Sequence, residues 1–181
     1  NAVIVDVEAT PARTYDEVAA TKTMIDRTER CFALRPKRLA ADTAYGTGKF
    51  LGWLVNAKGI TPHIPVWEKS DRADGIFSRA DFIWDKRHGH YICPNGKVLR
   101  TSGTIHGGRT LLYRASKLDC DVCSLKAKCC PKEPARKIPR DLHENARDVA
   151  RRKINTKAFL KSRDKRKRVE MRFAHLKIHH G

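Results

Sequence analysis

The stretch LAADTAYGTG, residues 39–48, decides the fold. Its apolar start, residues 39–41, has the composition of a buried strand end in a layered α/β domain. Asp42 follows directly, and in open α/β sheets functional sites gather beyond the carboxyl ends of strands. Thr47 is a suitable N-cap for the helix that follows, and Gly59 is suited to end it. The simpler alternative is that Asp42 only starts a turn, so a site here needs a partner elsewhere.

The elements on both sides of this stretch predict an α/β layer. Residues 2–9 alternate between apolar and polar side chains, which predicts a strand, and a helix is expected over about residues 14–30. Cys31, at the end of that helix, is expected in the core. A short strand is expected over residues 60–65, where prolines favour an edge position. The predicted order of strand, helix, strand, helix, strand covers residues 1–65.

The composition indicates a polyanionic partner. The chain has 181 residues, and its 38 Lys and Arg stand against 20 Asp and Glu, a formal net charge of +18. Such an excess is typical of proteins that bind nucleic acid. No apolar run reaches the length of a membrane span and no signal peptide is visible, so we expect a cytoplasmic protein without a membrane partner. Because the chain starts at Asn1 within a strand-like run, we expect a fragment.

The sequence pattern and the charge of the chain change twice along its length. From residue 66 to about 140, turn formers are frequent and short β-like pieces replace helical periodicity. These pieces are residues 82–84, 90–92 and 110–113. Residues 132–181 hold 17 Lys and Arg against six Asp and Glu, a net charge of +11. We therefore predict three segments: the first part of an α/β core (1–65), a β-rich insertion (66–140) and a basic helical segment (141–181).

The basic helical segment carries a second candidate carboxylate. At about 100° per residue, one sector of roughly 60° holds a carboxylate and three cations, namely Glu170, Arg163, Arg166 and Lys177. A solvated helix in which Glu170 pairs with Arg166 is the simpler explanation. Metal-dependent phosphoryl transfer requires the same set, because a carboxylate holds the divalent ion and cations hold the phosphodiester.

Taken together, these residues resemble the C-terminal catalytic part of a bacterial DDE-type insertion-sequence transposase. Asp42 in LAADTAYG resembles the second catalytic Asp of that family, which ends the fourth core strand. Glu170 in RKRVEMRF resembles the catalytic Glu on the last core helix. Arg166 and Lys177 occupy the family's positions four before and seven after that Glu, whereas Arg163 stands where many relatives have a Tyr.

The resemblance implies an RNase H-like core, incomplete at the N-terminus and interrupted by a β-rich, Cys-containing insertion. It also implies Mg²⁺-dependent strand cleavage and strand transfer in DNA transposition, with Mn²⁺ as a substitute for Mg²⁺. The implied metal ligands are Asp42 and Glu170, and the implied DNA contacts are Arg163, Arg166 and Lys177. The implied partners are double-stranded DNA of the transposon ends and target, and a second copy of the chain, in the bacterial nucleoid. Because the family's first catalytic Asp should precede Asn1, we expect this chain alone to be inactive.

The cysteines of the predicted insertion form a second group of candidate metal ligands. Cys120 and Cys123 form a Cys-x-x-Cys pair, and Cys93 lies in the turn-like sequence CPNG. A tetrahedral zinc site is one hypothesis, with the ligands Cys93, Cys120, Cys123 and Cys129. Cys130 is an alternative to Cys129 as a ligand, and His88 or His90 is an alternative to one of the four cysteines. Reduced thiols without a metal are the alternative.

A rival function comes from a different class of protein. A non-enzymatic nucleic-acid-binding module would use the cysteines as a zinc ribbon and the basic segment as an arm. A host nuclease with the same core is a third hypothesis. Dependence on Mg²⁺ or Mn²⁺ at Asp42 and Glu170 separates both enzymes from the binding module.

Overall fold

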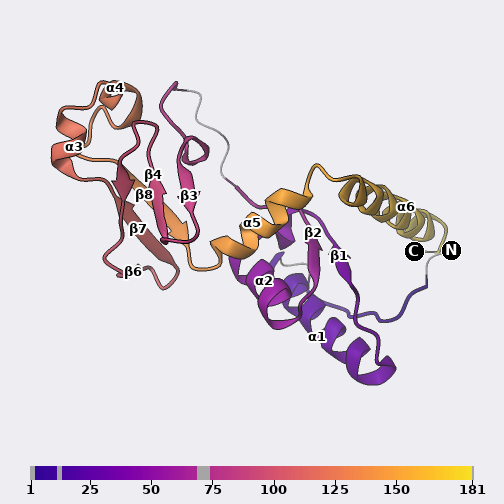
Figure 1. The fold of residues 1–181 in the computed structure, drawn as a ribbon. Helices are drawn as coiled ribbons and strands as arrows, with labels where there is room; N and C mark the ends of the chain where they lie inside the picture. Colours follow the sequence, from indigo (N-terminus) through magenta and orange to yellow (C-terminus); the bar gives the residue numbers. More distant parts are fainter. Residues whose placement is uncertain (1–2, 12–13, 69–73, 181) are drawn as a thin grey trace. The chain divides into compact units, whose positions relative to one another are not determined.

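The chain divides into two units of mixed helices and strands (Figure 1). Unit 1 comprises Asn1–Trp67 and His143–Gly181, and unit 2 comprises Glu68–Leu142. The computed structural model describes residues 3–11, 14–68 and 74–180, without the side chains at 14–15, 176–177 and 179–180. The predicted mixed α/β class is confirmed, and the RNase H-like core remains a prediction.

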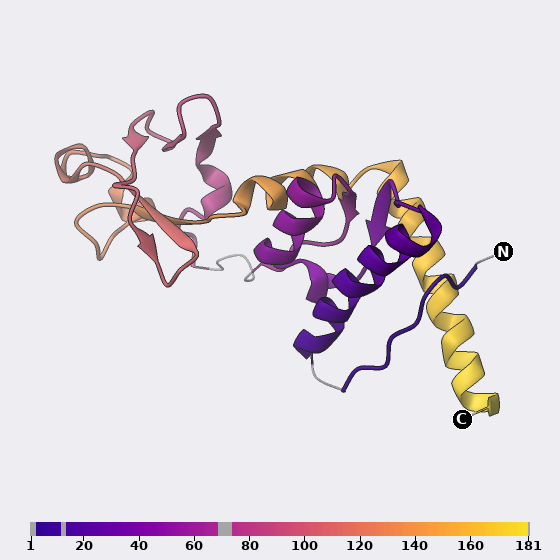
Figure 2. The same ribbon diagram turned by 90° about the horizontal axis from the view of Figure 1, so that it is seen from below.

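The described residues of unit 1 form four α-helices and two short strands. Its elements are α1 (Thr14–Phe32), β1 (Arg38–Ala40), the 3₁₀ turn η1 (Thr43–Tyr45), α2 (Gly48–Gly52), the π-helical turn η2 (Trp53–Ala57), β2 (Thr61–His63), α5 (Glu144–Lys153) and α6 (Lys157–His180). β1 and β2 are parallel, with Arg38 opposite Thr61 and Ala40 opposite His63. α6 packs against both strands (Figure 2). No helix in the described residues has the length and hydropathy needed to cross a membrane.

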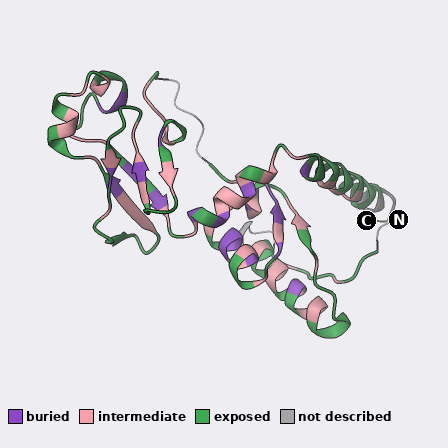
Figure 3. Cartoon of the chain, in the orientation of Figure 1, coloured by how far each residue is buried: buried purple, intermediate pink, exposed green. Residues whose placement is uncertain are grey.

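The core of unit 1 lies between α2, α5 and the strand β2 (Figure 3). Its buried members are Ile25, Phe50, Leu51, Leu54, Ile60, Ile64, Ala146 and Ala150. The predicted start of α2 is confirmed, because the hydroxyl of Thr47 accepts the N–H of Phe50 at 3.3 Å. Gly59 has a φ of +66°, a conformation that glycine adopts without strain, and it turns the chain toward β2.

The predicted strand over residues 2–9 is wrong for the described residues 3–9, which have no regular structure. The acidic side chains of this segment explain the difference. Asp6 accepts two hydrogen bonds from Arg27 of α1, at 2.8 and 2.7 Å, and Glu8 accepts a third at 2.8 Å. Because Arg27 attracts both carboxylates, the pKa of Asp6 is lowered. These ion pairs hold the segment without a strand partner, and the side chains of Val3 and Val7 are exposed.

Unit 2 is built on two three-stranded antiparallel sheets. The first contains β3 (Ile83–Asp85), β4 (His90–Ile92) and β5 (Val98–Leu99), and the second contains β6 (Ile105–His106), β7 (Thr110–Arg114) and β8 (Lys137–Asp141). The other elements are the 3₁₀ turn η3 (Arg79–Asp81), α3 (Lys117–Asp121) and α4 (Lys126–Cys129). The backbones of Arg100 and Arg114 exchange hydrogen bonds of 3.0 and 2.7 Å, which connect β7 to the end of β5.

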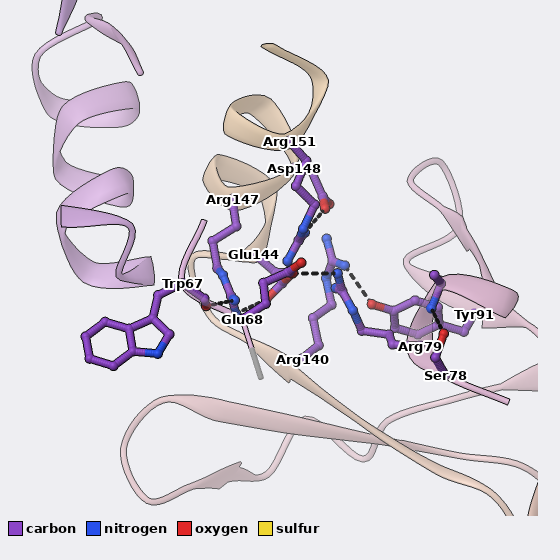
Figure 4. A network of polar contacts seen from close by, with 11 residues as sticks. Trp67, Glu68, Ser78, Arg79, Tyr91, Arg140, Glu144, Arg147, Asp148 and Arg151 are labelled. Atoms are coloured by element: carbon purple, nitrogen blue, oxygen red, sulfur yellow. Dashed lines mark hydrogen bonds and ion pairs between the residues drawn. The ribbon is translucent and has the colours of Figure 1, made fainter. Parts of the chain in front are cut away.

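Aromatic side chains form the core of unit 2. The rings of Trp84, Tyr91 and Tyr113 lie within 5.5 Å of one another, centroid to centroid. The guanidinium of Arg140 stacks 3.7 Å from the ring centroid of Trp84. It also donates to the hydroxyl of Tyr91 at 2.8 Å (Figure 4). Buried Arg140 is therefore held by a cation–π contact together with a hydrogen bond.

A buried carboxylate organises the start of α5. Glu144 is 2 % exposed and accepts hydrogen bonds from Arg147 at 3.1 Å and Arg151 at 2.6 Å (Figure 4). Arg151 also pairs with Asp148 at 2.5 Å. A second nitrogen of Arg147 donates to the backbone carbonyl of Trp67 at 2.7 Å. The network thus joins α5 to the segment that follows β2.

Candidate functional site

Asp42 lies two residues beyond the end of β1 and its side chain is exposed. One carboxylate oxygen accepts the N–H of Ala44 at 2.9 Å and so caps η1. This is the role of an Asp that starts a turn, and it fixes the side chain at the carboxyl end of the strand.

The loop after Asp42 is held closely against the segment after β2. A Cβ added at Gly46 would lie 2.1 Å from the carbonyl oxygen of Pro65 and 2.6 Å from the nitrogen of Trp67. The N–H of Trp67 donates to the carbonyl of Gly46 at 3.1 Å. Only glycine permits this approach, so the loop that carries Asp42 is fixed from both sides.

His63 connects the small sheet to α6. His63 is 6 % exposed, and its Nδ1 lies 2.7 Å from the hydroxyl oxygen of Ser162. Its ring also packs at 5.8 Å from that of Phe159, one turn earlier on α6. Burial lowers the pKa of His63, and the nearby charges of Arg38 and Lys153 lower it further. His63 is therefore a neutral, packed residue at neutral pH.

Glu170 lies on the same helix as Ser162, further toward its C-terminus, and its side chain is 53 % exposed. Arg166 donates to it at 2.5 Å across one helical turn. Arg163 lies 3.4 Å from its neighbour Asp164. The side chain of Lys177 lies outside the described residues. The structure thus shows an acidic residue and two arginines along one side of α6, each already in an ion pair.

The elements that carry the two candidate carboxylates meet, because α6 packs on β1 and β2. The carboxylates themselves have separate partners, Ala44 for Asp42 and Arg166 for Glu170. Within residues 3–11, 14–68 and 74–180, no group of three or more His, Cys, Asp or Glu has the arrangement of a formed metal site. Their oxygens are the hard donors that Mg²⁺ prefers, so the chemistry fits, but a magnesium site here needs at least one further ligand.

In unit 2, all five cysteines of the predicted insertion line one small cavity of about 20 Å³. The residues are Cys93, Cys120, Cys123, Cys129 and Cys130. None of the six cysteines forms a disulfide. Burial raises the pKa of Cys129 to about 12, with a smaller contribution from the neighbouring Cys130. Cys31, in contrast, is exposed, so its predicted place in the core is wrong.

The two histidines considered as replacement ligands lie elsewhere in unit 2. Nδ1 of His88 lies 2.7 Å from the carboxylate of Asp85, and Nε2 of His90 lies 3.9 Å from it. The hydrogen bond from His88 lowers the pKa of Asp85 to about 2. Neither histidine is among the described residues that line the cysteine cavity. The cysteines therefore form a cluster of their own.

Three residues that support these sites escaped the sequence-based prediction. His63 and Ser162 are 99 positions apart, and no local pattern connects them. The only available signal was the position of Ser162 three residues after Phe159, on the apolar side of the helix. Glu144 was not predicted as a buried residue, because it lies in a segment rich in charged residues. The signal for it was the presence of arginines three and seven positions later, which are suitable helical partners.

Residues 92–181 match the family described as "Transposase DDE domain". This range includes the five clustered cysteines and Glu170, whereas Asp42 lies before it. This match over residues 92–181 confirms the predicted resemblance to the C-terminal part of DDE-type transposases. No curated protein and no solved structure gives a significant match.

Proposed function

We propose that this chain acts in DNA transposition by cleaving and joining DNA strands. The observation that carries the proposal is the family match, which includes the helix α6 with Glu170. The packing of α6 on the strand that leads to Asp42 supports the pairing of these two carboxylates. The rival hypothesis of a non-enzymatic zinc-ribbon module receives no support from the family match.

Asp42 and Glu170 are proposed to hold Mg²⁺, for which Mn²⁺ can substitute. When bound, the metal would activate a water or a 3′-hydroxyl and stabilise the leaving oxygen at a phosphodiester. The two carboxylates would supply negative oxygen ligands from a strand end and a helix. Because Arg166 already pairs with Glu170, metal and phosphate binding would redirect this arginine toward the phosphate. Arg163 and Lys177 are proposed as further phosphate contacts.

The proposed partners are double-stranded DNA of the transposon ends and target, and a second copy of the chain in the active complex. The charge of the chain supports the first of these, since a net +18 favours a polyanion. A DNA-bound protein of this class is expected in the bacterial nucleoid. We also propose that the 181-residue chain alone does not cleave, because only two of the family's three carboxylates are matched among its residues.

The test is cleavage of a labelled duplex that contains the element ends, with Mg²⁺. The assay compares the 181-residue chain with the same chain extended by the residues that its coding DNA specifies upstream of Asn1. In the active form, Asp42→Asn and Glu170→Gln should abolish cleavage and leave DNA affinity nearly unchanged. The matched control is Asp164→Asn, an exposed acid on the same helix, which should keep activity. Undiminished cleavage by Glu170→Gln would overturn the assignment.

A further inference from the structure

The cysteine cavity of unit 2 collects thiols from three separate segments. Cys93 follows β4, Cys120 and Cys123 lie in and just after α3, and Cys129 ends α4. The cavity of about 20 Å³ has room for one small ion or one water molecule. Thiolates are ligands for a soft or borderline cation, and not for Mg²⁺.

A buried nitrogen of the half-buried Arg136 provides a second, independent observation. Nε of Arg136 is buried and has no hydrogen-bond partner in the part of the chain that the structure describes. The other nitrogens of Arg136 donate to the carbonyls of Cys129 at 2.7 Å and Phe77 at 2.8 Å. Arg136 also lines the cysteine cavity. A thiolate would satisfy this orphan donor, whereas a neutral thiol is a weak acceptor.

Two further hydrogen bonds already point at the sulfurs. The N–H of Lys97 donates to Sγ of Cys93 at 3.3 Å, in the turn that follows β4. The side-chain amide of Asn95 donates to Sγ of Cys123 at 3.5 Å. Donors of this kind stabilise negative charge on sulfur. Arg136, which lines the cavity, would offset part of the net −2 charge of a divalent ion with four thiolates, whereas Lys97 and Lys126 are already paired with Asp119 and Asp121.

We propose that Cys93, Cys120, Cys123 and Cys129 bind one Zn²⁺ that joins α3, α4 and the turn after β4. We assign Cys129 rather than Cys130 because Arg136, which lines the cavity, donates to the backbone carbonyl of Cys129 and so fixes the chain at this residue. No three ligand side chains in the described residues already have the spacing of a metal site, so the thiols rotate about χ1 to reach it. Binding replaces four S–H protons with four Zn–S bonds and releases four protons. The site is structural and does not depend on the proposed function.

The first experiment measures metal content in the full chain, purified under reducing conditions without chelator. Elemental analysis should find one zinc per chain. Cys93→Ser, Cys120→Ser, Cys123→Ser and Cys129→Ser should each lower this content at least about tenfold. The matched controls are Cys130→Ser, at the adjacent position, and Cys31→Ser, in unit 1, and both should keep the zinc. Zinc-free wild-type protein, or loss of zinc in Cys130→Ser but not in Cys129→Ser, would overturn the proposal.

A second measurement does not depend on the folding of the variants. Wild-type protein, stripped of metal and titrated with Co²⁺, should show the absorption of tetrahedral cobalt bound to thiolates and release four protons per cobalt. Alkylation of native protein should label Cys31 but none of the four ligands until a chelator is added. A cobalt spectrum without thiolate bands, or labelling of the four cysteines before chelation, would refute the site.

Discussion

Nδ1 of His63 and the hydroxyl oxygen of Ser162 lie 2.7 Å apart, which joins the end of β2 to the first turns of α6. Ala40 of β1 is the register partner of His63 and lies two residues before Asp42. Glu170 follows Ser162 by eight residues, about 12 Å along the helix axis. The bond therefore helps to position the helix that carries one candidate carboxylate against the strand that leads to the other.

Ser162→Ala should lower the free energy of unfolding by about 1 kcal/mol, because the buried imidazole of His63 loses its hydroxyl partner. Urea denaturation followed by circular dichroism measures the change. The control is Lys161→Ala, an exposed neighbour on the same helix, with an expected change below about 0.5 kcal/mol. Equal midpoints for wild type and Ser162→Ala would show that the bond does not contribute.

Stability should fall with acidification because of His63. Burial, then Arg38 and Lys153, lower its pKa in the folded chain below the 6.5 of the unfolded chain. The unfolded state therefore binds more protons, so the contribution of neutral His63 is complete above pH 6.5 and is lost as the pH falls through the folded-state pKa. The difference in unfolding free energy between wild type and His63→Gln should shrink from pH 7.5 to 5. His106→Gln, at an exposed position in β6, serves as the control.

DNA binding should depend steeply on salt, and the exposed face of α6 should carry part of that dependence. Replacing Lys161, Lys165 and Arg168 together with Gln should reduce the slope of log affinity against log salt by up to about three. Fluorescence anisotropy with a duplex of arbitrary sequence measures it. Replacing Lys86 and Arg87, exposed in the β3–β4 turn, is the control. An affinity that is constant from low to moderate salt would contradict the prediction.

Arg166→Ala should slow DNA cleavage less than Glu170→Gln does. We expect a loss of about ten- to hundredfold, since a hydrogen bond to a charged group contributes about 1.5–3 kcal/mol. The rate should be measured in single-turnover cleavage of the end-containing duplex. Arg172→Ala, an exposed arginine on the same helix, is the control and should retain the wild-type rate. Complete loss of cleavage in Arg166→Ala would assign this arginine a larger role than phosphate contact.

Glu144→Ala should destabilise unit 1 by about 2 kcal/mol or more. The change leaves Arg147 and Arg151 beside a buried position without its carboxylate. The loss should stay below the roughly 3–5 kcal/mol of fully buried pairs, because both arginines are partly exposed. Glu133→Ala, which removes an exposed pair with Lys137, should cost less than about 1 kcal/mol by thermal denaturation.

Local chemistry made part of the fold predictable from sequence. The cap at Thr47 and the turn at Gly59 depend on a few neighbouring residues, so both followed from the sequence, although the single helix expected between them is divided into α2 and the π-helical turn η2. The helix expected over about residues 14–30 is α1, which spans Thr14–Phe32, and the β-like residues 90–92 form β4. The strand predicted over residues 2–9 is absent from the described residues 3–9, because alternation alone supplies no pairing partner and Arg27 attracts the carboxylates of Asp6 and Glu8.

The parts of the fold and of the site that were not predicted from the sequence depend on long-range contacts. The approach of α6 to β2 depends on residues 99 positions apart, and the convergence of Cys93 with Cys120 depends on the folding of two small sheets. Cys31 was expected in the core because of its apolar neighbour Phe32, yet both side chains are exposed at the end of α1. Local sequence patterns and the family resemblance both indicate Asp42 and Glu170 as site residues, but neither predicts the distance or orientation of their side chains.

The hydrogen bond between Arg147 and the carbonyl of Trp67 has a consequence for how this chain can evolve. Trp67 is the last residue before unit 2 and Arg147 lies just after the chain returns from it, so both ends of the 75-residue excursion, Glu68–Leu142, are tied at one place in unit 1. Segments whose ends are anchored close together can be exchanged or resized with little disturbance of their host. Insertions, deletions and substitutions in unit 2 should therefore be tolerated in evolution, because they leave the arrangement of β1 and α6 in unit 1 unchanged.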